Sequence, residues 1–305
     1  MHGELGSLTH QLTGTADDQT YTYSRNRAQE IKSHSWSNNL YEWDVASNAT
    51  RSYTSNGLNQ YTAAAGATLG YDANGNLASD GIWSYTYDPE NRLLGASKSG
   101  TAATLSYDAL GRLRKTVIAG ATTQLLYDGD KLVGEYDAAG TLLRRNVHGP
   151  GTDEPVWYQV GSAGAKRWMH ADHLGSIVAR SEEPGVIASR YAYGPYGETR
   201  AADDTTSRFR YTGQQYIHQL GLHYYKARFY SGSLSPFCRD CSRSASDSRQ
   251  ARYGRTTVHH RFDKTCCILQ RVRGRFVVDD VLIEYRAHPL PNGSVNIGTI
   301  FPVKP

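Results

Sequence analysis

The dipeptide Tyr-Asp recurs five times between residues 71 and 137, in the frame Tyr-Asp-x-x-Gly-x-Leu where it is fullest. The copies begin at residues 71, 87, 107, 127 and 136, which are 16, 20, 20 and 9 residues apart, a spacing typical of a repeat array. Chance is a poor explanation, because the Gly and Leu positions recur as well. The repeat positions are Tyr71, Asp72, Gly75, Tyr87, Asp88, Tyr107, Asp108, Gly111, Tyr127, Asp128, Tyr136, Asp137 and Gly140.

Each repeat predicts a β-hairpin: a strand ending in Tyr-Asp, a tight turn, and a second strand starting near the Leu. The Asp side chain can accept hydrogen bonds from amides just downstream, and the Gly, or Asn91 in the second copy, accepts a positive φ. Residues flanking the turns alternate in character, as in 83–87. One hairpin cannot bury its apolar face alone, so we expect neighbours to stack along a continuous sheet.

Four further segments accompany the repeats, reading RRNVHGPGTDEP at 144–155, WMHADHLGSI at 168–177, RYTGQQY at 210–216 and LGLHYYKARFY at 220–230. Together with the repeats they resemble the Rhs/YD-repeat family over roughly residues 60 to 230. The resemblance implies an all-β shell of YD-repeat hairpins, curved or spiralling, of the kind shared with teneurins and insecticidal toxin complexes. It also implies that the shell encloses and delivers a variable C-terminal toxin.

Composition independently favours a polar β protein. The chain holds 30 Gly and 22 Tyr but only 2 Met among 305 residues, and its mean hydropathy is −0.58. A composition so rich in Gly and Tyr is not that of a helix bundle. No apolar run approaches the length of a membrane span, and residues 1–6 lack the basic and apolar regions of a secretory signal. Any export would therefore need dedicated machinery. The resemblance to Rhs proteins implies a bacterial protein that stays cytoplasmic until a specialised secretion system exports it, with delivery proteins and an immunity protein as partners.

The character of the chain changes after residue 230. Twenty of the 22 Tyr precede this point and all four Cys follow it. Residues 231–305 hold 12 Lys and Arg against 6 Asp and Glu, a net charge of +6 that suits a polyanion such as RNA. We predict four regions: degenerate repeats at 1–60, repeats and the Rhs-associated core at 61–230, a linker or displaced sequence at 231–267, and a C-terminal β-hairpin ending a toxin module at 268–305.

The junction between shell and tail departs from the family pattern. Rhs cores end in a motif resembling Leu-Gly-Arg-Phe-x-x-x-Asp-Pro-x-Gly, at which the protein cleaves itself, whereas 234–241 here reads LSPFCRDC. Self-cleavage is therefore not expected. Residues 231–267 are rich in Ser, Arg and Cys and poor in aliphatic residues, as in out-of-frame translation of a GC-rich gene, so a frameshift or recombination is our leading interpretation.

The last residues predict two strands, 275–285 and 294–302, joined through Asn292-Gly293. The sequence Thr-Ile-Phe-Pro at 299–302 is similar to the Thr/Ser-x-Phe/Tyr-Pro signature of barnase/EndoU/RelE-type ribonuclease toxins. The similarity implies metal-independent transesterification, in which a base removes the ribose 2′-OH proton and an acid protonates the leaving oxygen. His259 or His260 would be the base or acid, Lys264 the cation and Thr299 a phosphate ligand. The alternative is a four-residue coincidence.

Two clusters of side chains contain residue types that bind metals. We predict no metal ion at either cluster and no other cofactor. Cys238 and Cys241 begin a set of soft ligands that continues with Cys266, Cys267 and the two histidines, but its spacing is irregular for zinc. In the shell, His170, Asp172 and His173 belong to a segment that resembles the family core, so we expect them to hold the shell through buried hydrogen bonds and turns.

Two functions stay open on the sequence. The chain is either the C-terminal part of an Rhs polymorphic toxin, with a ribonuclease tail, or a non-enzymatic orphan YD-repeat fragment with a displaced tail. The shortness of the array and the missing cleavage motif favour the second, since about four hairpins cannot close a cage and would leave a sheet edge exposed.

Overall fold

The computed structural model describes residues 5–44, 52–64, 66–200 and 206–234, together with the backbone of four segments near the C-terminus, 237–238, 272–278, 281–289 and 295–302. Strands dominate this part of the chain. Its helical elements are two single turns of 3₁₀ type, η1 (Asn39–Tyr41) and η2 (Tyr211–Gly213), so the all-β prediction is confirmed. Among the described residues no helix has the length and apolar character needed to cross a membrane.

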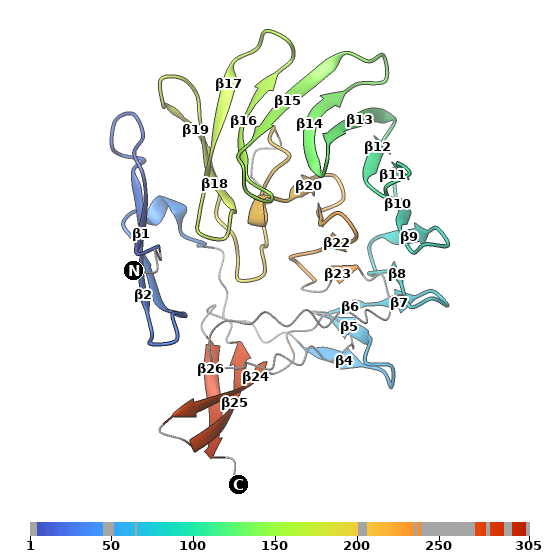
Figure 1. The fold of residues 1–305 in the computed structure, drawn as a ribbon. Coiled ribbons are helices and arrows are strands. Elements are labelled where there is room, and N and C mark those ends of the chain that lie inside the picture. The colour runs from blue at the N-terminus through green and yellow to red at the C-terminus, as the bar shows by residue number, and fades with distance from the viewer. Residues whose placement is uncertain are drawn as a thin grey trace.

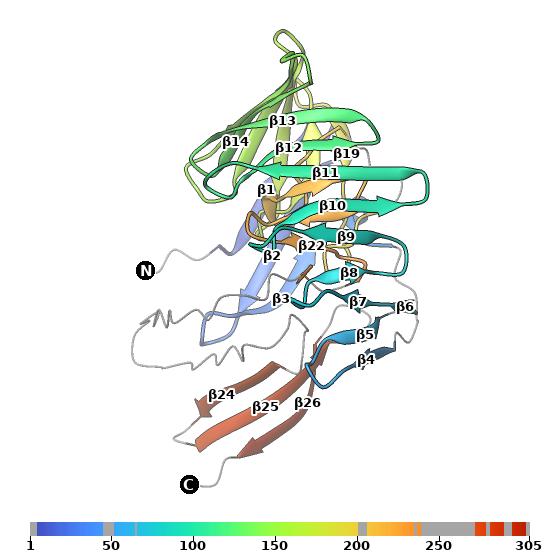
Figure 2. The same ribbon diagram turned by 90° about the vertical axis from the view of Figure 1, so that its right-hand side faces the viewer.

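The largest element is an antiparallel sheet of 13 strands in which strands adjacent in sequence are adjacent in space. Figures 1 and 2 show that this sheet is strongly curved and that its strands follow one another in chain order from β7 upward. Its strands are β7 (Gly70–Tyr71), β8 (Leu77–Ser79), β9 (Ser84–Tyr87), β10 (Leu93–Lys98), β11 (Thr101–Tyr107), β12 (Leu113–Ile118), β13 (Ala121–Asp128), β14 (Lys131–Tyr136), β15 (Leu142–His148), β16 (Pro155–Val160), β17 (Lys166–Ala171), β18 (Ile177–Ser181) and β19 (Ile187–Arg190).

The expected array of about four hairpins is therefore too small. The Tyr-Asp repeats account for the strands from β7 to β15, and the sheet continues through four more strands whose turns do not begin with Tyr-Asp. A sheet built only of consecutive antiparallel hairpins can be extended by any further hairpin of matching twist, whichever residues make its turn.

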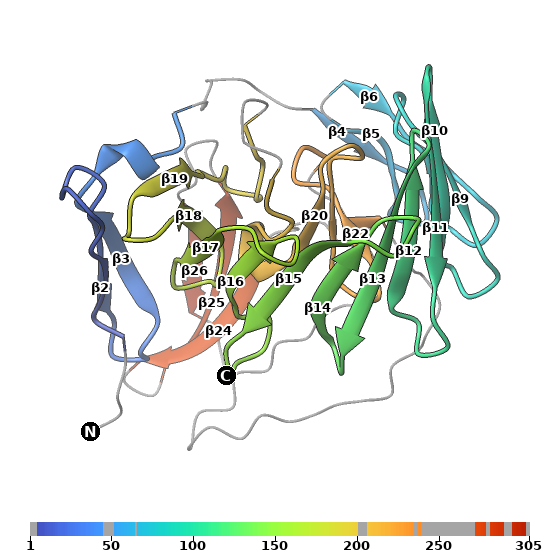
Figure 3. The same ribbon diagram turned by 90° about the horizontal axis from the view of Figure 1, so that it is seen from above.

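Four smaller sheets complete the described strands. The inner sheet (β20–β23) lies inside the curve of the large sheet, as Figures 1 and 3 show, whereas β1–β3, here called the N-terminal sheet, lies beside β18 and β19. Their strands are β1 (Ser7–His10), β2 (Gln19–Arg25), β3 (Ile31–Trp36), β4 (Tyr53–Ser55), β5 (Tyr61–Ala64), β6 (Ala67–Thr68), β20 (Gln215–Ile217), β21 (Leu222–Tyr224), β22 (Phe229–Tyr230), β23 (Phe237–Cys238), β24 (Val272–Val278), β25 (Val281–Pro289) and β26 (Val295–Pro302).

The C-terminal sheet has three strands where the sequence predicted two. The stretch 275–285 is divided, because Val278 pairs with Val281 and the chain reverses between them. The apolar run through this point reads as one strand, and no Gly or Pro marks the reversal. The second part of the prediction agrees with the structure, since β25 and β26 pair antiparallel.

The main hydrophobic core lies on the concave side of the large sheet. Alternate side chains of its strands point inward, with Leu105, Leu113 and Leu132 at most 1% exposed, and they pack against Leu222 and Tyr224 of the inner sheet, both 2% exposed. Burying each such side chain contributes about 1.5–3 kcal/mol. The inner sheet therefore fills the space that the curved sheet encloses.

Candidate functional site

The Tyr-Asp turns have the geometry that the sequence predicts. Oδ1 of Asp108 accepts hydrogen bonds from the amides of Leu110 and Arg112, each at 2.9 Å, and Gly111 has a φ of 78°. The turns at Asp72, Asp88 and Asp137 repeat the bonding, with Asn91 at a φ of 63° in the Gly position. The prediction of self-bonded turns is confirmed at these four repeats.

Tyr127-Asp128 makes a different turn. Asp128 pairs directly with Lys131, so Gly129 and Asp130 form a two-residue loop without the Asp-to-amide bonds. Conversely, Asp172 makes the full turn without a preceding Tyr, because its Oδ1 accepts from the amides of Leu174 and Ser176 at 2.8 and 2.9 Å. Asn26 and Asn56 do the same in the N-terminal part. In all of these turns an Asp or Asn side chain accepts hydrogen bonds from the amides two and four residues later. A sequence search for such turns, with either residue at the start, would have found these copies.

Tyrosine and arginine side chains join one repeat to the next. The hydroxyl of Tyr107 donates to the carbonyl of Leu93 at 2.8 Å, and Tyr87 donates in the same way to Leu77 at 2.9 Å. Arg112 is hydrogen bonded to Asp108 at 2.7 Å, while its guanidinium carbon lies 5.2 Å from the ring centroid of Tyr127. Partial burial disfavours the ionised form of Asp108, but hydrogen bonds from Arg112 and from the turn amides outweigh it, so the pKa of Asp108 is lowered.

Residues 206–234, here called the inner segment, bind the concave face through polar contacts as well as apolar packing. The hydroxyl of Tyr224 accepts a hydrogen bond from the amide of Leu113 at 2.8 Å, 111 residues away in the chain. The side chain of Gln215 donates to the hydroxyl of Tyr127 at 3.2 Å, so a repeat tyrosine contacts the inner sheet directly. Further along, the amide of Ile177 donates to the Arg210 carbonyl at 3.1 Å.

The inner segment also forms a buried ion pair with Glu135 on β14. Glu135 is fully buried and forms ion pairs with Arg208 of the inner segment at 2.9 Å and with Arg144 of β15 at 3.0 Å. Burial by itself would raise the pKa of Glu135, but the two guanidinium groups outweigh it and hold that pKa below its usual range. The carboxylate therefore stays ionised and ties the two layers together.

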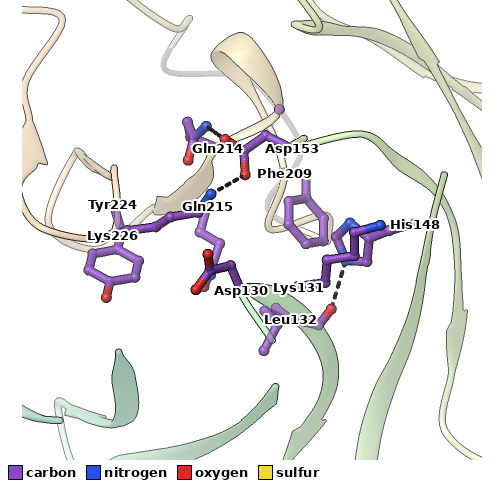
Figure 4. Close-up of a pocket in the computed structure, with 11 residues that line it drawn as sticks. Asp130, Lys131, Leu132, His148, Asp153, Phe209, Gln214, Gln215, Tyr224 and Lys226 are labelled. Carbon is purple, nitrogen blue, oxygen red and sulfur yellow. Dashed lines mark hydrogen bonds and ion pairs between the residues drawn. The ribbon is translucent and has the colours of Figure 1, made fainter. Parts of the chain in front are cut away.

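A small polar pocket lies between the inner segment and the large sheet (Figure 4). Lys226 and the side-chain amide of Gln214 contact Asp153 at 2.7 and 2.8 Å on one side, while on the other side a ring nitrogen of His148 bonds the Leu132 carbonyl at 2.9 Å. The volume of the pocket is about 20 Å³, space for a single water. It can hydrate polar groups at the seam but cannot hold a nucleotide or a sugar.

The tail residues of the ribonuclease prediction cannot be assembled into a site. His259, His260 and Lys264 lie outside the described residues, and of Thr299 only the backbone is described, in β26 opposite Arg286. Cys266 and Cys267 also lie outside, whereas the backbone of Cys238 pairs with that of Phe229. In the part of the chain that the structure describes, no group of three His, Cys, Asp or Glu side chains is arranged to hold a metal ion.

In the shell cluster of His170, Asp172 and His173, the first two make the hydrogen bonds expected of them, whereas Nδ1 of His173 is buried without a partner. Asp172 closes its turn, and a ring nitrogen of His170 is hydrogen bonded to the hydroxyl of Ser181 at 2.9 Å. Sequence reasoning missed Glu135 and Arg208, because their contact joins residues 73 positions apart. One feature of the sequence could have indicated the buried ion pair. A glutamate lies inside the apolar stretch that forms β14, and Arg144 follows on the next strand.

The fold and the site together define an all-β repeat shell whose concave face is lined by a segment of the same chain. No protein-family model matches the sequence. Over 166 residues, or 51% of the chain, it is 35% identical to the tRNA3(Ser)-specific nuclease WapA of Bacillus spizizenii and, with the same figures, to the tRNA nuclease WapA of Bacillus subtilis. The match spans only 7% of the length of these relatives.

Solved structures give a weaker likeness. A crystal structure of TcdB2-TccC3-Cdc42 shares 19% identity and a TM-score of 0.49, covering 72% of this chain and 12% of that one. The Photorhabdus luminescens Tc holotoxin pore shares 17% identity and a TM-score of 0.45, covering 76% and 12%.

Proposed function

We propose that this chain is a C-terminal part of an Rhs polymorphic toxin, in which the curved sheet encloses and delivers a variable C-terminal effector. The observation that carries the proposal is the similarity over half the chain to nucleases named WapA, together with a shell-like sheet whose concave face is lined from within. The relatives are far longer than this chain, so a shell completed by further repeats would be needed to surround an effector.

The proposed effector is the basic tail, acting on RNA without a metal ion. Its substrate would be tRNA, the molecule in the names of the WapA relatives. His259 and His260 would exchange the protons of transesterification, Lys264 would stabilise the phosphorane and Thr299 would bind phosphate. An immunity protein in the producing cell and secretion-system proteins for delivery would be its partners.

Inducible expression in a bacterial host tests this proposal. Three forms are compared: the full chain, the tail alone (235–305), and the shell alone (1–234). Growth arrest with tRNA fragmentation by the tail, absent from the shell and abolished by the double substitution His259→Ala/His260→Ala, would support the ribonuclease. Normal growth and intact tRNA with the tail detected in cells would contradict it.

A second candidate function is favoured by the sequence at the junction. Because 234–241 lacks the Gly-Arg and Asp-Pro-x-Gly elements of the family's cleavage motif, the tail would not be released by self-cleavage. The chain would then be a non-enzymatic YD-repeat fragment with a displaced tail. Intact tRNA in the experiment above, with a folded shell, is the outcome that this candidate predicts.

A further inference from the structure

The N-terminal sheet packs against the large sheet through a separate interface, distinct from the main core. Tyr21, Tyr23 and Tyr41, each at most 9% exposed, form an apolar cluster with Val178 and Ala179 of β18. This interface is also crossed by a hydrogen bond from the amide of Thr13 to the carbonyl of Gly185 at 3.1 Å. The contact joins residues more than 150 positions apart, so it closes the chain into a larger curved unit.

Four histidines lie at the same interface, in two pairs. His10 of β1 and His170 of β17 have ring centroids 5.3 Å apart, edge to face. His34 of β3 and His173, in the turn after β17, have centroids 5.2 Å apart. In each pair one histidine belongs to the N-terminal sheet and the other to the large sheet. The two sheets therefore face each other with imidazole against imidazole.

The groups that surround the four histidines are compatible with neutral imidazole rings. His10 Nε2 donates to the carbonyl of Ala171 at 2.8 Å, and the ring of His34 is stacked on that of Tyr23 at 5.1 Å. The tyrosines that face the pairs from β2, Tyr21 and Tyr23, have pKa values raised by burial and therefore stay neutral at neutral and acidic pH. The carboxylate that interacts with these histidines is Asp172, and its Oδ1 already accepts two turn amides.

Two other ion pairs join the N-terminal part of the chain to residues after β18, and neither involves these histidines. They are Asp17 with Arg190 and Asp44 with Arg200. One carboxylate can offset one imidazolium, but it cannot offset a cation on both rings of the His10–His170 pair. Protonation of both rings would place like charges 5.3 Å apart in the half-buried His10–His170 pair, where water screens them less than in solution, whereas His34 of the second pair is exposed.

We propose that the half-buried pair His10 and His170 forms an acid-sensitive latch, which holds the N-terminal sheet against the large sheet at neutral pH and releases it when these two imidazoles are protonated. Burial lowers the pKa of His10 and, together with the neighbouring His10 ring, lowers the pKa of His170 to about 4. A depressed histidine pKa means that the released state binds the proton more readily. Docking is therefore at full strength above the ordinary pKa of 6.5 and weakens as the pH falls from there toward 4.

Hydrogen exchange of the full chain at pH 7.5, 6.5, 5.5 and 4.5 tests the latch, after correction for intrinsic exchange rates. The peptide that contains Thr13 reports on docking, since its amide bonds across the interface, and a peptide from β11 reports on the large sheet. We expect protection at Thr13 to fall about tenfold or more between pH 7.5 and 4.5 while β11 keeps its protection. Equal protection at Thr13 across this range would overturn the proposal.

Two variants separate the latch from general acid sensitivity. His10→Gln/His170→Gln keeps an uncharged donor for the Ala171 carbonyl and should dock equally at all four pH values. His148→Gln is the matched control, because His148 also bonds a carbonyl but lies outside this interface, so it should respond as the wild type does. A double variant that loses Thr13 protection in parallel with the wild type would overturn the latch.

If the double variant is undocked already at pH 7.5, the single variant His170→Gln, which keeps the His10 bond to the Ala171 carbonyl, provides the second test. It should reduce the loss of protection at low pH, and an unchanged loss would count against the proposal. The latch is independent of the proposed ribonuclease, since it concerns only the shell, and each can fail without the other.

Discussion

At the scale of single residues, the Asp of two repeats, Asp88 and Asp108, does two things: it closes its own turn and it orients the arginine that lies on the next tyrosine. Replacing Asp108 by Ala removes the acceptor of two amides and the partner of Arg112. We expect the free energy of unfolding to fall by about 1–3 kcal/mol. Asp128→Ala is the matched control and should change stability by less than about 0.5 kcal/mol, because Asp128 is exposed and closes no such turn. Urea denaturation followed by circular dichroism measures both.

The same carboxylate predicts a pH signature. The folded pKa of Asp108 is lowered, so its contribution is present above the ordinary pKa of 3.8 and is lost as the pH falls through the folded value. The difference in urea midpoint between wild type and Asp108→Ala should therefore shrink below pH 4. A difference that stays constant from pH 7 to pH 3 would show that the ionised form is not what stabilises the turn.

The residue scale is also where the sequence was most informative. The turn at Asp108 was predictable because every partner lies within four residues, so the motif itself contains the structure. Tyr127-Asp128 matched the dipeptide but lacked the Gly three residues after the Asp, and it forms a different turn. The contact of Glu135 with Arg208 could not be predicted in this way, since a local pattern holds no information about which distant strand will face it.

At the scale of elements, the inner segment is joined to the large sheet by a small number of buried polar contacts. Glu135→Ala would leave two arginines beside an empty, water-excluded position, and we expect a loss of about 3–5 kcal/mol. Arg145→Ala, at an exposed neighbouring position on β15, is the control and should be nearly neutral. Limited proteolysis should cut Glu135→Ala within 206–234 much faster than wild type. Equal cleavage rates would show that apolar packing alone holds the inner segment.

Tyr224 offers a second test at this scale, with almost no change in volume. Tyr224→Phe removes the hydroxyl that accepts from the Leu113 amide and leaves a buried N–H without that partner, at a cost of about 1–3 kcal/mol. Tyr136→Phe is the control, since its ring lies over Gly134 and its hydroxyl has no such contact across the layers. Thermal unfolding of the two variants should therefore differ by several degrees. Equal midpoints would indicate that the contact adds nothing to stability.

At the scale of the whole molecule, the curved sheet and the inner segment form one cooperative unit, because each covers apolar surface that the other would expose. The concave core contains Phe209, Ile217, Leu220, Leu222 and Phe229 from the inner segment alone, each at most 4% exposed. Without them the large sheet would present a wide apolar face to water, which favours association. A chain ending at 234 should therefore be monomeric, whereas a chain ending at 205 should aggregate and bind the dye ANS strongly. Size-exclusion chromatography and dye fluorescence distinguish the two. A monomeric 1–205 with little dye binding would show that the sheet covers its own concave face, and the inner segment would then be free to serve as a removable lining.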